Sequence, residues 1–257
     1  MPTRVLFGNH SLIFDSILLF LDRSVYDPVM GDPSEHDVDS FDFVVPLTMA
    51  DRAALDRGGS DGPVRAIIPS MEAVRLCHDK LAFNRMMMES GFGRYIPELI
   101  ECEKAKPPFI LKRREDEFGF NSEVIRTDQD YIRAKERIDS VKFFKQTYID
   151  GEIEHATHIL MRNGEVAYQK TVRYEMKAGD YVKGHQTSHE EVSWSDGTPS
   201  VDIFAGMLRA AGFNNGTCCI DYKIVGEAPK VFEINPRFGG SLPYDINRYL
   251  AAYASAL

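Results

Sequence analysis

Polar residues inside two apolar, strand-like runs near the end of the chain are the feature that most constrains the fold. The runs GTCCIDYKIV (216–225) and KVFEINPRF (230–238) are joined by the short connection GEAP, which favours an antiparallel pair. Glu233 and Asn235 are two positions apart, so they project from the same face of their strand. Asp221 stands twelve residues before Glu233, where it can lie beside it on the neighbouring strand. The sequence therefore predicts two carboxylates and an amide that converge from adjacent strands.

Such a group of hard oxygen atoms suits Mg²⁺, which takes one or two protein carboxylates and completes its shell with substrate phosphates. Pro236 can end the strand, so that Arg237 emerges beside the metal. The fixed charge of Arg237 can there stabilise a phosphoryl group during transfer. A solvated surface hairpin is the alternative interpretation, but it does not explain the apolar runs CCI and VFEI around the polar residues.

The composition is that of an ordinary globular protein, with 44% hydrophobic and 27% charged residues. A net charge of −9 argues against a nucleic-acid partner, because phosphate backbones are bound by basic surfaces. The apolar stretch 12–21 is interrupted by Asp15 and Ser16 and is too short to span a bilayer, and no basic segment typical of a secretory signal precedes it. We therefore expect a cytoplasmic protein with no membrane partner. Its four cysteines are expected to be reduced thiols: Cys77, Cys102, Cys218 and Cys219.

Alternating strand and helix signals at the start of the chain predict an α/β (α+β) architecture. Residues 1–69 are expected to form a small α/β domain with a parallel sheet. The segment has no GxGxxG motif, so it is not assigned to dinucleotide binding. Its predicted strands are TRVLF (3–7), FDFVVPL (41–47) and RAIIP (65–69).

The remaining chain is predicted to change from helix to strand. Residues 70–106 are expected to form a helical linker, with one helix across Ser70–Gly91. Strand signals dominate in 107–145 and 146–257, which predicts two β-rich subdomains. The pair Asn163–Gly164 lies between alternating apolar runs and predicts a tight hairpin.

The run CCIDYKIV…KVFEINPRFGGS resembles the C-terminal signature of the ATP-grasp superfamily, in which this motif binds two Mg²⁺ ions and the triphosphate. The resemblance implies that three residues are ligands of Mg²⁺, with Mn²⁺ as an alternative: Asp221, Glu233 and Asn235. It also implies that Arg237 contacts the phosphate or the acyl phosphate. Residues 239–241 (GGS) fall where many relatives bind the substrate carboxylate.

The rest of the chain resembles the same family, in order, over about residues 70–245. HDKLAFNRMMMESGF resembles the helical Asp-Lys segment and gives Lys80, and PFILKRREDEFGFNS gives Lys112 before a phosphate-covering loop. QTYIDGE is similar to the adenine hinge, with Gln146 where relatives usually have Glu. The resemblance implies that backbone groups of three residues contact the adenine: Thr147, Tyr148 and Ile149.

Two departures from the family pattern leave assignments open. Many relatives place an acidic residue two positions after the hinge glycine for the ribose hydroxyls, and here Glu152 and Glu154 flank that position. Glu154 is the favoured ribose contact. The phosphate-covering loop is less glycine-rich than usual, and its Arg113 and Arg114 are either phosphate contacts or solvated charges.

Lys170 and Arg173 follow the predicted hairpin and are three positions apart, so they should point to opposite faces of the strand. Lys170 is favoured as the residue that neutralises the γ-phosphate or binds the acid substrate. His185 and His189 have a spacing that suits zinc on a helix, but their segment lacks helical character and the HExxH pattern. A structural role is the default for four histidines: His155, His158, His185 and His189.

These expectations converge on an ATP-dependent carboxylate ligase. ATP would lie between the subdomains 107–145 and 146–257, and a substrate carboxylate would attack its γ-phosphorus to give an acyl phosphate. An amine, the second substrate in most relatives, would displace phosphate, so that ADP and phosphate are the products. The expected partners are a small-molecule acid and an amine, and a homodimer is compatible with the sequence. A small-molecule kinase and a non-catalytic nucleotide-binding protein are the alternatives.

Overall fold

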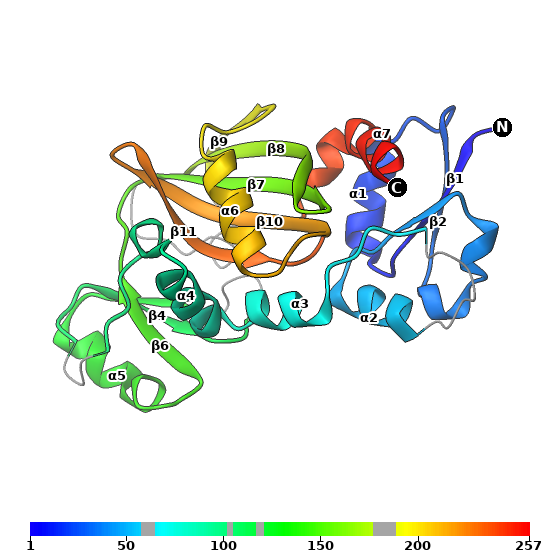
Figure 1. Ribbon diagram of the computed structural model, residues 1–257. Coiled ribbons are helices and arrows are strands. Elements are labelled where there is room, and N and C mark those ends of the chain that lie inside the picture. Colours follow the sequence, from blue (N-terminus) through cyan, green and yellow to red (C-terminus); the bar gives the residue numbers. More distant parts are fainter. Residues whose placement is uncertain (58–64, 102–104, 117–120, 177–188) are drawn as a thin grey trace.

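The described part of the chain forms three β-sheets with helices packed around them (Figure 1). The computed structural model describes residues 1–57, 65–101, 105–116, 121–176 and 189–257. The predictions for Cys102 and His185 lie outside the described residues. The described cysteines are free thiols, as expected. Within the described ranges, no helix is long and apolar enough to cross a membrane.

The amino-terminal sheet is parallel, as the sequence predicted. Its strands, in order across the sheet, are β2 (Tyr26–Met30), β1 (Thr3–Phe7) and β3 (Phe43–Val45). The predicted strand at 65–69 is wrong, and β2 supplies the third strand instead. The backbone bonds give the reason, because Ile67 N–H donates to the Tyr253 hydroxyl at 2.6 Å. The Val44 N–H of β3 donates to the Arg65 carbonyl oxygen at 2.8 Å, but at Ile67 the Tyr253 side chain takes the place of a further strand bond.

Helices cover both faces of the parallel sheet. Val5 and Phe7 share an apolar core with α1 (Ser11–Phe20) and α7 (Ile246–Ala256), whereas Leu6 packs with Leu55 of α2 (Met49–Arg57) on the other face. This alternation follows from the two-residue period of a strand. Figure 1 shows α7 beside α1, so the amino-terminal unit takes its last helix from the end of the range 146–257.

The helix predicted across Ser70–Gly91 is divided into α3 (Met71–His78) and α4 (Lys80–Glu89). The break falls at Asp79, whose Oδ1 accepts from the backbone N–H groups of Leu81 at 3.1 Å and Ala82 at 3.2 Å. Asp79 therefore caps a new helix, because its side chain satisfies N–H groups that have no partner inside the first turn. The cap places Lys80 on the first residue of α4.

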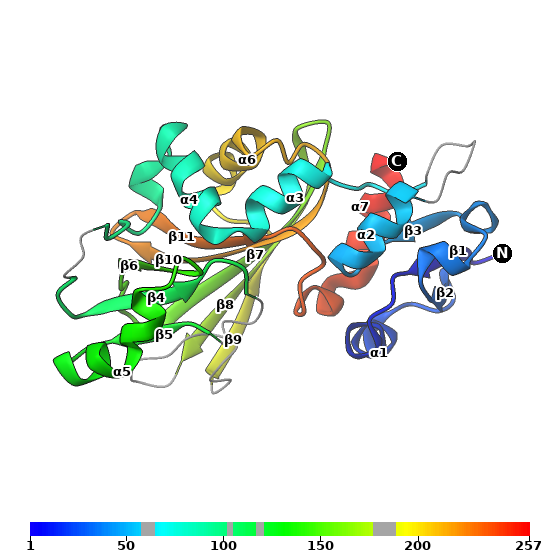
Figure 2. The same ribbon diagram turned by 90° about the horizontal axis from the view of Figure 1, so that it is seen from below.

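A small antiparallel sheet forms the first β-rich subdomain. Its strands, in order, are β5 (Glu123–Ile125), β4 (Phe109–Arg113) and β6 (Phe143–Thr147). Helix α5 (Asp128–Ile138) packs Ala134 against Phe109 and Leu111. In Figure 2 this helix lies on the side of the small sheet that faces away from the large sheet. The opposite face of the small sheet is therefore turned toward the rest of the molecule.

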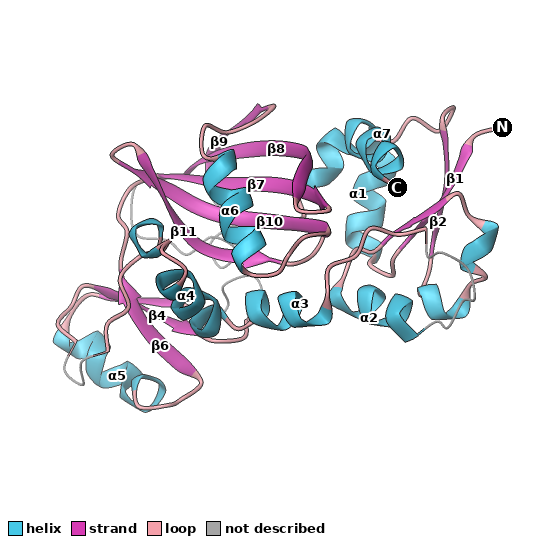
Figure 3. Ribbon diagram, viewed as in Figure 1, coloured by secondary structure: helices cyan, strands magenta, loops and turns pink. Residues whose placement is uncertain are grey.

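The large antiparallel sheet carries the polar strand pair. Its strands, in order, are β11 (Ala228–Asn235), β10 (Gly216–Val225), β7 (Ile153–Arg162), β8 (Glu165–Met176) and β9 (His189–Ser195). The β7–β8 hairpin turns at Asn163 (φ 52°) and Gly164 (φ 82°), which confirms the predicted tight turn. Helix α6 (Val201–Ala210) packs with α3 and α4 on one face (Figure 3), where Phe204 and Ile220 are fully buried. The other face borders the site.

Short 3₁₀ helices connect these elements in the described chain: η1 (Pro33–Glu35), η2 (Val38–Ser40), η3 (Gly93–Tyr95) and η4 (Leu242–Asp245).

Candidate active site

One row of residues crosses the large sheet on the face opposite α6. The strand registers place Glu233, Asp221, Ala156, Val172 and Trp194 opposite one another, from β11 to β9. All of them except Val172 line a cavity of about 540 Å³. A cavity of this size suits a small-molecule ligand. The row is acidic on β10 and β11 and apolar on the remaining strands.

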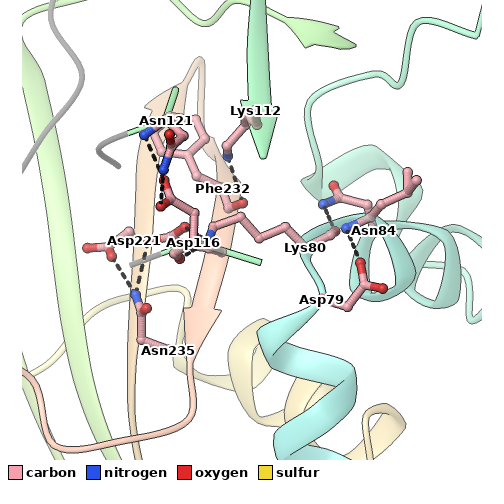
Figure 4. A network of polar contacts seen from close by, with 11 residues as sticks. Asp79, Lys80, Asn84, Lys112, Asp116, Asn121, Asp221, Phe232 and Asn235 are labelled. Atoms are coloured by element: carbon pink, nitrogen blue, oxygen red, sulfur yellow. Dashed lines mark hydrogen bonds and ion pairs between the residues drawn. The ribbon is translucent and has the colours of Figure 1, made fainter. Parts of the chain in front are cut away.

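The acidic end of the row has the geometry that strand alternation predicted. Asp221 lies directly opposite Glu233, and the Asn235 amide nitrogen donates to Asp221 Oδ2 at 3.0 Å and to Glu233 Oε1 at 3.1 Å (Figure 4). A half-turn of that amide would present its oxygen to the same point, since the two amide ends have the same shape. Two carboxylates and an amide oxygen within hydrogen-bond reach fit Mg²⁺. The set contains only two acidic groups, and no cluster of three His, Cys, Asp or Glu ligands occurs among the described residues.

Two buried lysines meet this acidic set from other elements. Lys80 reaches from α4 to Glu233, with 3.3 Å between Nζ and Oε2, and also donates to the backbone carbonyl of Asp116 (Figure 4). Lys112, on β4, donates from Nζ to the Phe232 carbonyl oxygen at 3.1 Å. The two side chains are therefore cations held over the strand pair, where they can neutralise phosphates.

The electrostatics of the site reflect this burial. Burial lowers the pKa of Lys112 from 10.5 to about 8, although the Glu233 carboxylate acts in the opposite direction. Burial also acts to raise the pKa of Glu233, but the charges of Lys80 and Lys112 outweigh it and hold that pKa well below its usual range. Glu233 is therefore ionised at neutral pH, as a metal ligand must be.

The start of the predicted phosphate loop is fixed to the start of α4. Arg114 donates from Nε to Asp79 Oδ1 at 3.1 Å, and the Lys80 backbone N–H donates to the Arg114 carbonyl oxygen at 2.9 Å. Arg113 is exposed. Neither arginine is among the residues that line the cavity in the described chain. The charge of Arg114 pairs with the helix cap. A phosphate contact stays a prediction for both arginines.

Gln146 lies in a buried amide network that explains why it replaces the usual glutamate. Its Nε2 donates to Asn84 Oδ1 at 2.8 Å and to the Pro97 carbonyl oxygen at 3.0 Å. Asn84 in turn donates from Nδ2 to the Lys80 carbonyl oxygen at 2.5 Å. A glutamate carboxylate has no N–H to offer to these two acceptors. The network ties the hinge strand β6 to the helix that carries Lys80.

The predicted nucleotide hinge borders the same cavity. Three residues predicted to contact adenine line it: Thr147, Tyr148 and Ile149. Glu154 also lines the cavity, with 6% of its surface exposed, whereas Glu152 is exposed. Lys223 holds the turn that follows the predicted hinge, because its Nζ donates to the carbonyl oxygens of Ile149 at 3.2 Å and Gly151 at 2.6 Å. Glu154 thus lies at the cavity and Glu152 does not, and the ribose contact of Glu154 stays a prediction.

A second row lies next to the acidic row, toward the far end of the cavity. The registers place Asn235, Cys219, His158 and Lys170 opposite one another on β11, β10, β7 and β8. Lys170 continues this row by donating to Asp196 Oδ1 at 2.8 Å. Polar and titratable side chains therefore occupy four adjacent strands beside the predicted metal ligands.

Lys170 and Arg173 occupy opposite faces of β8, as strand alternation predicted. Lys170 shares the face of Tyr174, which lines the cavity, and Arg173 forms an ion pair with Glu175 at 2.9 Å. Lys170 itself is not among the cavity-lining residues of the described chain. Its contact with a substrate stays a prediction.

Arg237 and the loop 239–241 close the far end of the cavity, and all four residues line it. The Arg237 N–H donates to the Asn235 carbonyl oxygen at 2.8 Å, which makes the tight turn at Pro236. Ser241 Oγ lies 2.8 Å from His158 Nε2. Arg237 and Ser241 thus lie at the cavity, where their predicted substrate contacts stay predictions. His158, for which the sequence favoured a structural role, contacts the same loop.

Three buried residues of the site went unrecognised in the sequence: Asn84, His158 and Lys223. His158 carried a usable signal, because it stands four residues after Glu154 on one strand and therefore on the same face. Asn84 and Lys223 carried none, because their partners are distant in sequence. Asn84 accepts from the side chain of Gln146, 62 residues away, and Lys223 donates to the carbonyl oxygens of Ile149 and Gly151, 74 and 72 residues away.

Comparison with known proteins identifies the fold. No family model matches the sequence, and no curated protein is significantly similar to it in sequence. The structure is similar to a D-alanine–D-alanine ligase from Bacillus anthracis solved with ATP, with a TM-score of 0.62 and 14% identity, over 100% of this chain and 97% of that one. It is also similar to the VanG D-Ala:D-Ser ligase from Enterococcus faecalis, with a TM-score of 0.64 and 13% identity, over 98% and 100% of the two chains.

An N5-carboxyaminoimidazole synthetase from Staphylococcus aureus, solved with ADP, has a TM-score of 0.65 and 13% identity, over 96% of this chain and 73% of that one. These three enzymes share the ATP-grasp fold. The chain has the ATP-grasp fold, and the fold predicted from the sequence is confirmed. At this level of identity the similarity defines the fold, and the chemistry has to be argued from the site.

Proposed function

We propose that this protein is an ATP-dependent ligase that activates a substrate carboxylate as an acyl phosphate and joins it to an amine, with release of ADP and phosphate. One observation carries the proposal. Two buried lysines, Lys80 and Lys112, meet the set formed by Asp221, Glu233 and Asn235. Lys112 and that set line a cavity that also borders the predicted nucleotide hinge. Binding of a triphosphate requires that combination of cations and metal ligands, whereas a simple structural ion pair does not.

Different parts of the cavity would bind different parts of the substrates. The hinge end, with Tyr148 and Glu154, would hold the nucleoside, and Lys80 and Lys112 would neutralise the phosphates. Mg²⁺ bound by the acidic set would draw charge from the β- and γ-phosphates. Arg237, at the far end, would contact the phosphoryl group as it passes to the carboxylate.

The proposed reaction needs no side-chain nucleophile, because holding the substrates in the right positions is enough to promote phosphoryl transfer. The acid and the γ-phosphate would be held together in one cavity, so the reaction becomes effectively intramolecular. Trp194 and Tyr174 line the cavity from β9 and β8, and they would limit the access of water to the acyl phosphate. The D-alanine–D-alanine ligases and an L-amino acid ligase from Bacillus licheniformis are among the similar structures, which supports an amino acid as one substrate.

A screen for ADP release, over pairs of amino acids and small acids with Mg²⁺ and ATP, tests the proposal. We expect ADP and phosphate with at least one pair, and we expect Glu233→Gln to lower that turnover roughly 10²–10³-fold. Glu227→Gln is the matched control, because Glu227 is exposed at the turn of the same hairpin. Formation of AMP and pyrophosphate would contradict the ligase mechanism. Retention of phosphate on the product would indicate a kinase, and ATP binding without ADP release would indicate a non-catalytic protein.

A further inference from the structure

A buried histidine lies beneath the loop at the reacting end of the cavity. His158, on β7, is fully buried, and its Nε2 lies 2.8 Å from the Ser241 Oγ. Ser241 lines the cavity, whereas His158 lies behind it. A side chain in the cavity is therefore linked by one hydrogen bond to a group that can accept a proton.

The loop is packed on the ring so that this hydrogen bond has a fixed geometry. A Cβ atom on Gly239 would lie 2.4 Å from His158 Cε1 and 3.1 Å from Cys219 Cβ. Only glycine allows the loop to approach the ring so closely. The loop therefore rests on His158 at Gly239 and is bonded to it at Ser241, and these two contacts fix the direction of the serine hydroxyl.

The charges around His158 are balanced. Lys170 lies directly opposite on β8, with its Nζ 2.8 Å from Asp196 Oδ1 and 3.8 Å from Asp245 Oδ2. Cys219 lies opposite on β10. Arg248 pairs with the same carboxylates, at 2.7 Å from Asp196 and 4.0 Å from Asp245, so two cations face two carboxylates. A proton that arrives on the ring therefore does not meet an uncompensated positive charge.

We propose that His158, acting through Ser241, accepts the proton that the attacking amine releases in the second half of the ligation. The inference rests on the proposed function. The amine nitrogen attacks the acyl carbon, a C–N bond forms, and the C–O bond to phosphate breaks with its electron pair leaving on phosphate. The nitrogen passes one proton to Ser241 Oγ while the serine proton passes to His158 Nε2. The step uses the neutral ring with its proton on Nδ1, and Ser241 is the group that touches the substrate.

Replacing the amine substrate by hydroxylamine separates a role of His158 in proton transfer from a structural role. Hydroxylamine attacks acyl phosphates as an unprotonated, strong nucleophile and gives a hydroxamate with little need for a base. With the acid found in the ADP-release screen, we expect His158→Gln to lower amine ligation about 10²–10⁴-fold, the usual contribution of general-base catalysis. Hydroxamate formation and ATP affinity should stay near the wild-type values.

Two further variants complete the experiment. Ser241→Ala should likewise lower amine ligation far more than hydroxamate formation, and this ratio decides the question if His158→Gln does not fold. His155→Gln is the matched control, because His155 lies on the same strand with its ring stacked on Tyr222 at 5.0 Å, on the helix-covered face. Equal loss of amide and hydroxamate in the His158 and Ser241 variants, or no loss in either, would overturn the relay. Absence of hydroxamate with the wild-type protein would instead refute the proposed ligase activity.

Discussion

The most direct physical consequence of the site concerns the stability of the protein above neutral pH. Burial lowers the pKa of Lys112 from 10.5 to about 8. Between those two values the unfolded chain keeps the proton and the folded chain has lost it. The free energy of unfolding therefore rises with pH in this window, because the unfolded state binds more protons. Replacing Lys112 by Met removes that contribution.

The magnitude follows from the width of the window. From about pH 8 to about pH 9.5 the gain is 1.5 units at about 1.4 kcal/mol per unit, or about 2 kcal/mol. Lys112 has only 6% of its surface exposed, so solvent screening does not remove the effect. Burial raises the pKa of the Cys77 and Cys218 thiols, and these groups act in the opposite direction. The useful quantity is therefore the difference in unfolding free energy between wild type and variant, because the contributions of the thiols cancel in it.

Urea unfolding of wild type and Lys112→Met, at about pH 7 and about pH 9.5, measures that difference. We expect the stability of the wild type relative to the variant to rise by about 2 kcal/mol between the two conditions. Lys142→Met is the matched control, because Lys142 is exposed on the same subdomain and its charge is solvated in both states. A difference that changes by less than about 0.5 kcal/mol would refute the assignment of a desolvated ammonium to Lys112.

Further predictions concern the contacts that hold the site together. Lys223→Met removes both bonds to the hinge turn and should weaken ATP binding about tenfold or more, measured by calorimetry, while the dependence on Mg²⁺ persists. Gln146→Glu places a carboxylate against two acceptors and should lower the unfolding free energy by about 1–3 kcal/mol in urea titrations. Tyr253→Phe leaves the Ile67 N–H without its acceptor and should cost about 1–3 kcal/mol by the same measurement.

The strand pair that carries Asp221, Glu233 and Asn235 was predictable because the pattern that specifies it lies within one short stretch of sequence. Alternation fixes the faces of Glu233 and Asn235, and the short connection fixes the antiparallel partner that brings Asp221 opposite. In the structure the same alternation places Cys218 in the core and Cys219 on the cavity face. These placements need only the two-residue period of a strand and a turn, both of which can be read from the sequence.

Other parts of the site depend on contacts between distant segments, which a single sequence does not encode as a pattern. His158 and Ser241 are 83 residues apart, and their hydrogen bond becomes evident only when β7 and the final loop are packed together. The break at Asp79 was missed for another reason. Helical periodicity continues through Asp79, and an aspartate inside such a run does not by itself indicate the cap that its side chain forms here.

The nature of the contacts across the cavity connects the stability prediction with the proposed chemistry. The apolar core of the small sheet, around Phe109, and that of the large sheet, around Ile220, are separate clusters. The bonds from Lys112 to the Phe232 carbonyl and from Lys80 to Glu233 cross between elements that frame the cavity, and both are polar. Under the proposed function the cavity must admit water, nucleotide and metal, so it cannot be closed by an apolar core, and polar contacts join its walls instead. The loss of the Lys112 proton therefore relieves the cost of a buried charge and, under the proposed function, removes a charge that binds phosphate, so stability and nucleotide binding should change in opposite directions at the same pH.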